Sequence, residues 1–242
     1  MTDARVAVVT GAAQGLGRAV ADRLVQGGFR VCYVDVNAEK LDAIEHGAHA
    51  MTAVADVSDP QAVAEVVEAV LSRWGKIEVL VNNAGIRYET PLEAISLEEW
   101  NRVLAVNLTG TFLFSQAVLP QMRRQRWGRI IIMSSYGGQA GPLTSGAHYC
   151  ASKAGQLALM KVLARMSAQD GVTVNAVAPA AIHTPEMDRI DPEKLARMVA
   201  SIPVGRVGEP EEVAELVWFL ASEAAGYITG ATFDINGGLL MR

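Results

Sequence analysis

Short apolar runs rich in β-branched residues alternate along this chain of 242 residues with longer segments in which apolar residues recur every three or four positions. The first pattern is typical of strands buried on both faces, and the second is typical of amphipathic helices. The predicted strands are residues 5–10, 30–35, 50–55, 77–81, 129–133, 172–177 and 231–235. The predicted helices are residues 18–26, 38–46, 60–74, 97–126, 149–168 and 210–221. Repeated strand–helix units predict an α/β fold, a doubly wound parallel sheet with helices on both faces.

The chain shows neither a linker nor a low-complexity segment, so we expect a single domain over residues 1–242. Ligands of open parallel sheets bind at the carboxyl ends of the strands, so we expect the cofactor and the catalytic site at that edge of the same domain. The notable residues at predicted strand ends are Gly11, Asp35, Asp56, Asn82, Ser135 and Pro179.

A glycine-rich turn joins the first predicted strand to the first predicted helix, in the sequence Thr10-Gly11-Ala12-Ala13-Gln14-Gly15-Leu16-Gly17. Strand, turn and helix in this order place a helix N-terminus against a diphosphate. Gly11 permits the tight turn, Gly15 allows a close approach of backbone to ligand, and Gly17 allows close helix–strand packing. The context predicts a dinucleotide site, although the glycine spacing is looser than G-x-G-x-x-G.

The second predicted strand ends in Asp35, about 20 residues beyond the glycines. A carboxylate at this place can accept hydrogen bonds from the hydroxyls of the adenosine ribose, and it would repel a 2′-phosphate. Asp35 therefore favours NAD as the cofactor and makes NADP less expected. Arg18 and Arg30 are the cations that could reverse this preference.

Composition narrows the partners further. The net charge of −5 disfavours a nucleic-acid partner, and the arginines between residues 123 and 129 are expected to form a solvated helix end. Cys32 and Cys150 form no disulfide framework and no metal-binding pattern, and reduced thiols suit the cytoplasm. With no signal-type N-terminus and no apolar run long enough to cross a bilayer, we expect a cytoplasmic protein with no membrane partner.

Tyr149 and Lys153 lie four residues apart at the start of a predicted helix, so they share one face of it. A free phenol has a pKa near ~10 and is a poor proton-transfer group at neutral pH. A neighbouring ammonium favours the phenolate and is expected to lower that pKa, which makes the pair a candidate general acid/base. A lone pair of this kind is more often a surface feature, so the assignment depends on the rest of the chain.

Taken in order, the motifs resemble those of the short-chain dehydrogenase/reductase family, and the resemblance covers nearly the whole chain. They are Thr10-Gly11-x-x-x-Gly15-x-Gly17, Asn82-Asn83-Ala84-Gly85, Asn107, Ser135, Tyr149-x-x-x-Lys153, Asn175-Ala176-Val177-Ala178-Pro179 and Asp234-Ile235-Asn236-Gly237-Gly238. Within that family, the motifs most resemble those of the branch that contains 3-oxoacyl-carrier-protein reductases and secondary alcohol dehydrogenases. The resemblance implies a Rossmann-type fold and a homotetramer or dimer built through helices 97–126 and 149–168.

The family resemblance also implies roles for individual residues. Tyr149 resembles the general acid/base, and Lys153 would lower its pKa and bind the nicotinamide ribose. Ser135, in preference to Ser134 or Ser145, would hold the substrate oxygen, and Asn107 would brace a water chain leading to Lys153. Cofactor contacts are implied for Gly11, Gln14, Gly15, Leu16, Gly17, Asp35, Asp56, Val57, Asn83, Ala84, Gly85, Tyr149, Lys153, Pro179, Ile182 and Thr184.

One departure from the family pattern is Pro179-Ala180 in place of the usual Pro-Gly, so the loop beside the nicotinamide is expected to be stiffer or shifted. The substrate side is the least determined part of the chain. The residues expected to line it are Ile86, Arg87, Tyr88, Tyr136, Gln139, Pro142, His183, Glu186 and Met187, with Arg87, Tyr136, Gln139 and His183 as candidate substrate contacts. His148 is expected to cap or pack, and the segment after Pro185 suggests a small lid.

Four functions fit the sequence. The first is an NAD(H)-preferring oxidoreductase acting on a small-molecule secondary alcohol or ketone, which Asp35 favours. The second is a reductase of 3-oxoacyl-carrier-protein or 3-oxoacyl-CoA that uses NADPH, which the C-terminal motif and the arginines at 123–129 favour. A dehydratase or epimerase and a non-catalytic binding protein are disfavoured, because Asn107, Ser135, Tyr149 and Lys153 are all present.

Overall fold

The computed structural model describes residues 4–44, 47–141, 145–184, 187 and 191–242. Over these residues, parallel strands form one seven-stranded sheet in the order β3-β2-β1-β4-β5-β6-β7. The strands are β1 (Val6–Thr10), β2 (Arg30–Asp35), β3 (Ala50–Val54), β4 (Val79–Asn82), β5 (Gly128–Met133), β6 (Val172–Pro179) and β7 (Thr232–Ile235). The strand order reverses between β1 and β4, which confirms the predicted doubly wound, single-domain Rossmann-type fold.

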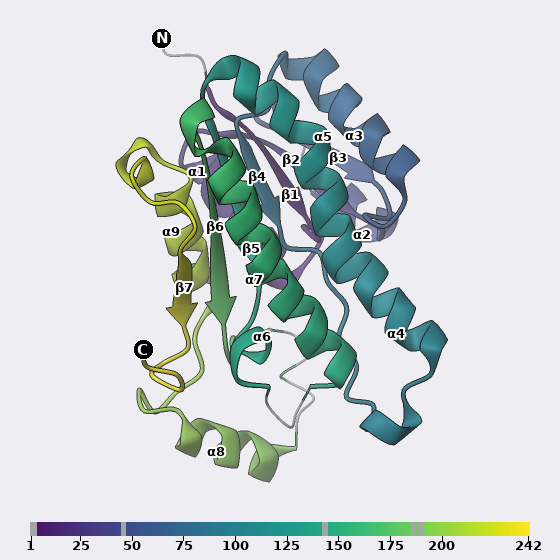
Figure 1. Ribbon diagram of the computed structural model, residues 1–242, viewed down its shortest axis with the longest axis vertical. Helices are drawn as coiled ribbons and strands as arrows, with labels where there is room; N and C mark the ends of the chain where they lie inside the picture. Colours follow the sequence, from purple (N-terminus) through teal and green to yellow (C-terminus); the bar gives the residue numbers. More distant parts are fainter. Residues whose placement is uncertain (1–3, 45–46, 142–144, 185–186, 188–190) are drawn as a thin grey trace.

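Helices cover both faces of this sheet (Figure 1). They are α1 (Gly15–Gln26), α2 (Ala38–Asp42), α3 (Pro60–Trp74), α4 (Leu97–Leu104), α5 (Gly110–Gln125), α6 (Gly137–Ala140), α7 (Ala147–Ser167), α8 (Pro192–Ser201) and α9 (Pro210–Leu220). Val6 and Val8 of β1 pack toward α3, α5 and α7, whereas Ala7 and Val9 pack toward α1 and α9. Because both faces are covered, β1, β4, β5 and β6 in the middle of the sheet are buried along their whole length.

The predicted helix over residues 97–126 is divided. Residues Ala105–Thr109 (η2) form a π-helical turn between α4 and α5, and Asn107 lies in it. The helix carrying Tyr149 begins two residues earlier than predicted, at Ala147. The expected helix 38–46 ends at Asp42, and its residues 45–46 lie outside the described part of the chain.

Two helices were not predicted, α6 and α8, and both lie at the carboxyl ends of the strands (Figure 1). Helix α8 begins where sequence signals could have placed it. The Asp191 carboxylate accepts hydrogen bonds from the main-chain N–H groups of Glu193 and Lys194, and Pro192 occupies the first helical position. An acceptor side chain followed by proline is a typical helix start, so residues 192–201 of the segment expected to form a small lid are helical.

One continuous helical segment, Leu97–Gln125, is long and apolar enough to cross a bilayer, with a mean hydropathy of 1.4 over its best window. The sequence predicts no apolar run long enough to cross a bilayer, and this segment corrects that expectation in length and hydropathy. Half of that window is buried inside the protein, which is typical of a helix packed in a core. The length and hydropathy of this segment therefore carry little weight as a sign of a membrane span.

Candidate active site at the carboxyl edge of the sheet

The β1–α1 turn is held by the chain that follows β4. The Thr10 hydroxyl accepts hydrogen bonds from the main-chain N–H groups of Asn83 and Ala84, both at 3.0 Å. The Asn83 amide in turn donates to the carbonyls of Thr10 and Gly11, at 3.0 and 3.1 Å. The predicted cofactor residues on these two loops are therefore locked together before any ligand binds.

Each of the three glycines of the turn occupies its position for a different structural reason. Gly11 has a φ of +65°, and a Cβ there would lie 2.8 Å from the Ala84 Cα. A Cβ at Gly17 would lie 2.1 Å from the Gly11 carbonyl oxygen, so only glycine allows this helix–strand approach. A Cβ at Gly15 would meet no atom of the described residues within 4 Å. Gly15 thus borders open space at the N-terminus of α1, where a diphosphate would fit.

Asp35 lies against this turn. One carboxylate oxygen accepts a hydrogen bond from the Ala13 N–H at 3.1 Å, and the other accepts one from the Asn37 N–H at 3.0 Å. A carboxylate has about four lone-pair sites, so both oxygens keep acceptor capacity for ribose hydroxyls. The neighbouring Gln14 side chain accepts a hydrogen bond from the Lys40 ammonium. Lys40 is a cation beside the cofactor turn that the sequence analysis did not consider.

The two cations named from the sequence as possible exceptions do not reach this place. Arg18 is bonded to Asp22, with Nε–O distances of 2.8 and 2.7 Å, and stacks over Tyr33. Arg30 begins β2, whereas Asp35 ends it, so the length of the strand separates them. Lys40 is the better candidate for contacting a 2′-phosphate.

Asp56 and Val57, expected beside the adenine, follow β3 at the same edge. The Asp56 carboxylate accepts hydrogen bonds from the Ser58 N–H and hydroxyl, and pairs with Arg102 at 3.1 Å. Partial burial would raise the pKa of Asp56, but these hydrogen bonds and the guanidinium hold it below its ordinary value. Val57 is buried and packs against Gly110, where α5 begins. Asp56 is thus fixed by protein contacts that the sequence did not predict.

Tyr149, Ser135 and Lys153 meet where β5 ends against the first turns of α7. The Ser135 hydroxyl hydrogen-bonds the Tyr149 side chain and also accepts the Gly137 N–H at 2.9 Å. The Lys153 ammonium lies 5.7 Å from the centroid of the Tyr149 ring and donates to the Met133 carbonyl at 2.6 Å. The neighbouring Ser134 hydroxyl instead donates to the Lys153 carbonyl, and so faces away from the phenol's partners. This arrangement favours Ser135 over Ser134 as the serine of the site.

Burial dominates the acid–base properties of this pair. It raises the pKa of Tyr149, while the hydrogen bond from Ser135 and the charge of Arg87 act in the opposite direction. Burial also lowers the pKa of Lys153 from 10.5 to about 7. The sequence argument considered only the charge of Lys153, which favours a lower pKa of Tyr149, whereas burial raises that pKa. It neglected the cost of desolvating both groups.

Asn107 acts on the main chain around the pair. Its side-chain oxygen accepts the Ile86 N–H at 2.8 Å, and its amide nitrogen donates to the Ile86 carbonyl and to the Ser152 hydroxyl, both at 3.0 Å. A Cβ at Gly85 would lie 3.3 Å from the Asn107 oxygen and 3.7 Å from the Lys153 nitrogen. Asn107 and Lys153 thus flank the same glycine. π-Helical turns such as η2 occur frequently at functional sites.

Comparisons with known proteins agree with this geometry. A family model described as enoyl-(acyl carrier protein) reductase matches residues 11–240. The 3-oxoacyl-[acyl-carrier-protein] reductase FabG of Escherichia coli is 39% identical over 241 residues, covering 99% of this chain and 98% of that protein. The acetoacetyl-CoA reductase of Rhizobium meliloti is 42% identical over 238 residues, covering 97% and 98%. FabG of Thermotoga maritima is 38% identical over 244 residues, covering 99% of both chains.

The chain belongs to the short-chain dehydrogenase/reductase family. As such it is an oxidoreductase that acts on CH–OH or ketone groups and uses a nicotinamide cofactor. The residues present fit that cofactor, because the glycine turn leaves open space at the N-terminus of α1 and a carboxylate ends β2. Among the described residues, no group of three His, Cys, Asp or Glu side chains could hold a metal ion.

The loop expected to cover the nicotinamide follows β6. Pro179 is the last residue of that strand, and its carbonyl accepts the Tyr136 N–H at 2.8 Å, which joins this loop to the residue after Ser135. Ile182 is buried and forms a β-bridge with Gly208, and Thr184 follows two residues later. Ala180 donates its N–H to the Ile235 carbonyl, and its φ is not positive. The alanine therefore replaces the family's glycine here without backbone strain.

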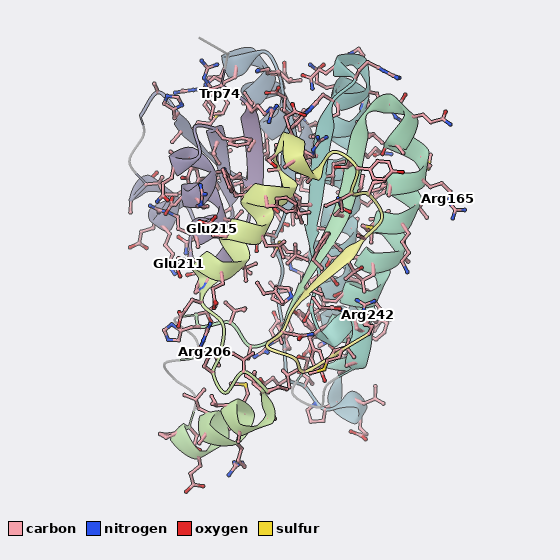
Figure 2. The ribbon with its side chains drawn as sticks, turned by 90° about the vertical axis from the view of Figure 1, so that its left-hand side faces the viewer. Trp74, Arg165, Arg206, Glu211, Glu215 and Arg242 are labelled. Atoms are coloured by element: carbon pink, nitrogen blue, oxygen red, sulfur yellow. The ribbon has the colours of Figure 1, made fainter. Side chains whose placement is uncertain are left out.

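The expected substrate contacts are mostly engaged within the protein. Gln139 donates to Asp234 at 2.6 Å, and Asp234 also pairs with Arg242, which is labelled in Figure 2. Arg87 pairs with Glu89 at 3.1 Å, although its charge still acts on Tyr149.

His183 is half exposed and lies 3.7 Å from Glu209, beside the start of α9. Of the remaining expected lining residues, Pro142 and Glu186 lie outside the described part of the chain.

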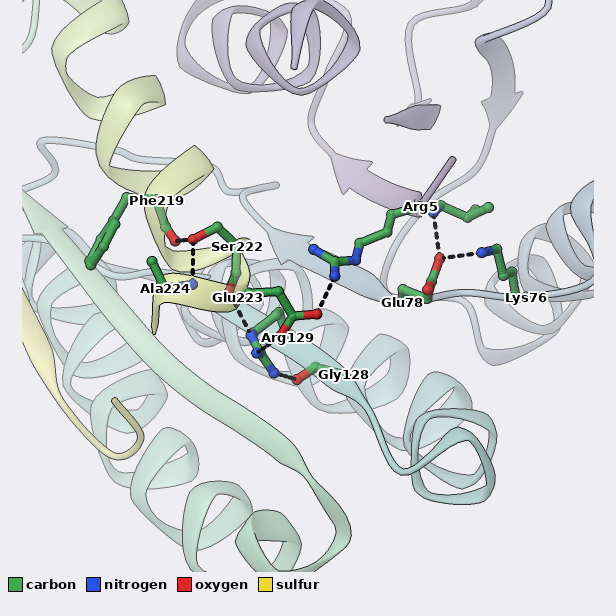
Figure 3. A network of polar contacts seen from close by, with 10 residues as sticks. Arg5, Lys76, Glu78, Gly128, Arg129, Phe219, Ser222, Glu223 and Ala224 are labelled. Atoms are coloured by element: carbon green, nitrogen blue, oxygen red, sulfur yellow. Dashed lines mark hydrogen bonds and ion pairs between the residues drawn. The ribbon is translucent and has the colours of Figure 1, made fainter. Parts of the chain in front are cut away.

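The arginines between residues 123 and 129 lie at the opposite, amino edge of the sheet. Arg129 is not solvated as expected. It is buried, bonded to the carbonyls of Gly128 and Ser222, and stacked on Trp127 (Figure 3). Arg123 and Arg126 both pair with Asp170, at 3.0 and 3.3 Å. Arg123 and Arg126 thus share one carboxylate, and these arginines lie at the far end of β5 from Ser135.

Proposed function

We propose that this chain is a reductase of 3-oxoacyl thioesters that prefers NADH, with Tyr149 as the general acid/base. The observation that carries the catalytic part is the convergence of Tyr149, Ser135 and Lys153 at the carboxyl edge, beside a glycine turn built for a diphosphate. The substrate class is supported by relatives, named as reductases of 3-oxoacyl-carrier-protein and acetoacetyl-CoA, that match the chain over nearly its whole length. This favours the substrate class of the second function considered from the sequence, whereas the proposed cofactor is that of the first.

The proposed mechanism divides the work between cofactor and protein. When bound, a nicotinamide cofactor would supply the hydride that reduces the ketone carbon. The Ser135 hydroxyl would hold the ketone oxygen, and the phenol of Tyr149 would give it a proton. The raised pKa of Tyr149 keeps the phenol protonated before the reaction, which suits a general acid in the direction of reduction.

Lys153 is proposed to return the proton. Its pKa of about 7 means that the ammonium can release and regain a proton near neutral pH. Its neighbour Asn107 holds the Ile86 main chain on one side and Ser152 on the other, which keeps the path beside Gly85 in place. Cofactor and catalytic groups would therefore share one domain.

The cofactor preference depends on Asp35. Its carboxylate is fixed at the turn by the Ala13 N–H, where a negative charge would repel a 2′-phosphate. Lys40 works against this preference, because its ammonium reaches Gln14 on the same turn. We propose that the carboxylate prevails, since it is held by two main-chain N–H groups.

The form of the thioester is the remaining choice. The sequence arginines suggested docking of an acidic carrier protein, but Arg123 and Arg126 share Asp170, and Arg129 is buried. These contacts weaken the charge argument for a carrier protein. We propose that an acetoacetyl-CoA-like thioester is accepted without a carrier.

The test is a steady-state comparison with acetoacetyl-CoA, a panel of simple ketones, and NADH and NADPH. We expect the highest kcat/KM with acetoacetyl-CoA and NADH. A higher kcat/KM with simple ketones would contradict the thioester assignment. A higher kcat/KM with NADPH would show that Lys40 prevails over Asp35 at the ribose.

We also propose a cytoplasmic homo-oligomer, a tetramer or dimer. Phe112 on α5, and Val162 and Met166 on α7, are large apolar side chains between 43% and 61% exposed. Burial raises the pKa of Cys32 to about 12, so this thiol is an inert core residue that suits a reducing compartment. Light scattering on a size-exclusion column would contradict the assembly if it gave the mass of one chain, 25.8 kDa.

A further inference from the structure

The first turn of α7 has an unusual cap. Helix N-termini leave N–H groups without intrahelical partners, and a Ser, Thr, Asp or Asn side chain at the N-cap normally accepts the one at the third helical position. The N-cap residue of α7 is Gly146, which has no side chain, and the third helical residue is Tyr149. The N–H that needs an acceptor therefore belongs to the proposed general acid.

His148 supplies that acceptor. Its Nδ1 atom accepts the Tyr149 N–H at 2.8 Å, and its ring is fully buried. A main-chain N–H can only donate, so Nδ1 carries no proton and Nε2 carries the proton of the neutral ring. Nε2 lies 2.6 Å from a Glu99 carboxylate oxygen on α4, and so donates to it.

Several neighbouring residues pack closely against His148 or hold its partners in place. A Cβ at Gly146 would lie 2.3 Å from the His148 Cε1 atom, although the backbone of Gly146 has an ordinary negative φ. Glycine is needed here for space rather than for conformation. The Gly146 N–H donates to the Tyr88 carbonyl at 2.9 Å, and the Tyr88 ring lies 6.1 Å from the imidazole. Glu99 is itself fixed, because its N–H donates to the Ser96 cap of α4.

The carbonyl of Tyr149 is tied to the same part of the chain. It accepts a hydrogen bond from the Ser152 hydroxyl at 2.7 Å, and Ser152 accepts one from Asn107 at 3.0 Å. The N–H of Tyr149 thus connects to Glu99, and its carbonyl connects to Asn107. Glu99 and Asn107 both lie on the α4–η2 segment, eight residues apart in sequence. The backbone of Tyr149 is held on both sides by one neighbouring segment.

We propose that His148 is a positioning residue for Tyr149, acting as the cap that α7 lacks and tying the first turn of that helix to Glu99. This inference rests on the proposed role of Tyr149. His148 itself does not touch substrate, because it is fully buried and both ring nitrogens are engaged. Its effect comes through the aim of the phenol, and a displacement of about 1 Å can cost about 100-fold in rate.

A matched pair of variants separates the two ring nitrogens. In His148→Asn the amide oxygen can occupy the place of Nδ1 and keep the bond to the Tyr149 N–H, but the side chain is too short for Glu99. In His148→Gln the amide nitrogen can reach the place of Nε2 and keep Glu99, but the bond to Tyr149 is lost. We expect kcat of His148→Gln to fall about 10- to 100-fold, with KM and the Kd for NADH within about threefold of the wild type.

We expect kcat of His148→Asn to stay within about threefold of the wild type, because it keeps the bond that aims the phenol. All variants are measured well below their Tm, so that loss of folded protein does not enter kcat. Equal falls in both variants, or an unchanged kcat in His148→Gln, would overturn the proposal. If His148→Gln does not fold, His148→Leu makes the same test, because leucine cannot accept the Tyr149 N–H, so its kcat should fall about 10- to 100-fold. Glu99→Leu removes only the partner of Nε2 and, like His148→Asn, should keep kcat within about threefold, with Glu98→Leu as the exposed control on α4.

Tyr149→Phe, measured in parallel, distinguishes failure of this inference from failure of the proposed function. Substantial turnover by Tyr149→Phe would remove the general acid and the positioning role together. An inactive Tyr149→Phe with a fully active His148→Gln would remove only the positioning role.

Discussion

The two edges of the sheet treat their polar residues in opposite ways. At the amino edge, Arg129 and Arg5 both stack on Trp127 and both approach Glu223, while Lys76 pairs with Glu78 (Figure 3). These side chains bind one another or neighbouring carbonyls. At the carboxyl edge, polar side chains mostly bind main-chain groups of the loops, as Thr10, Asn83 and Asn107 do.

This difference suggests that the amino edge contributes mainly to stability and the carboxyl edge mainly to the chemistry. The charged side chains of the amino edge are paired with one another, and they join the starts of the strands to the segment after α9. Few of their polar groups remain for a ligand to bind. At the carboxyl edge, polar side chains hydrogen-bond the main chain of the loops and leave the edge open. Gly15 borders free space there, and the Tyr149 phenol and the Lys153 ammonium lie close together. Changes at the two edges should therefore affect different measurements, and the following variants test that division from the largest expected effect to the smallest.

The largest effect is expected from Tyr149→Phe. Removing the hydroxyl removes the proton donor, and general acid–base catalysis contributes about 100- to 10,000-fold, so we expect kcat to fall about 1,000-fold. The Kd for NADH should stay within about threefold. The measurement is steady-state turnover beside a fluorescence titration with NADH. Turnover within tenfold of the wild type would place the chemistry elsewhere.

At the amino edge, Arg129→Met should lower the free energy of unfolding by about 2–4 kcal/mol and leave kcat unchanged. Two carbonyls lose their donor in a buried setting, which costs about 1–3 kcal/mol each before relaxation. The comparison is urea unfolding against Arg165→Met, an exposed arginine on α7 that should be nearly neutral. A large fall in kcat for folded Arg129→Met would contradict the division between the edges.

Lys153→Met should stabilise the protein in a pH-dependent way. The folded pKa of Lys153 is about 7, and the ordinary value is 10.5, so between these pH values the unfolded chain binds a proton that the folded chain does not. Burial of the Lys153 ammonium thus lowers the free energy of unfolding by its full amount below pH 7, and it has no such effect above about pH 10.5. We expect the variant to be more stable by about 1–3 kcal/mol at pH 7, after loss of the bond to Met133.

This advantage should shrink as the pH rises from 7 to 10, measured by urea unfolding at each pH. The matched control is Lys161→Met, an exposed lysine on the same helix. A stability difference that is constant across the pH range would show that the ammonium is not desolvated.

The smallest effect is expected from Asp35→Asn. The amide oxygen can still accept the Ala13 N–H, so the turn is kept while the negative charge is lost. The ratio of NADPH to NADH affinity should rise about tenfold, which corresponds to about 1.4 kcal/mol. Asp42→Asn, an exposed acid on α2, is the control and should not change the ratio. An unchanged ratio in Asp35→Asn would mean that Asp35 does not face the ribose.

The parts of the fold predicted from the sequence are those encoded by local patterns. Apolar runs predicted the strands, and the glycine-rich turn between β1 and α1 was recognised from its glycines. The start of α3 is also a local signal, because Asp59 caps it and Pro60 occupies the first helical position. The π-helical turn at Asn107 was not predictable, because it accompanies hydrogen bonds to Ile86, 21 residues away.

Contacts distant in sequence account for the other omissions. Asp56 with Arg102 and His148 with Glu99 join residues 46 and 49 positions apart, and no local pattern marks such pairs. The direction of the pKa of Tyr149 was missed for a related reason. Spacing shows that Lys153 is near, but only the packed structure shows how deeply both groups are buried.

Hydrogen exchange of the main-chain amides with and without saturating NADH tests the division between the two edges most directly. We predict protection in the β1–α1 turn, at residues 35–40, 83–87 and 179–184, with no change at residues 126–129 and 222–224 of the amino edge. Protection at the amino edge, or no protection in the glycine turn despite saturation, would contradict the placement of the cofactor and the account built on it.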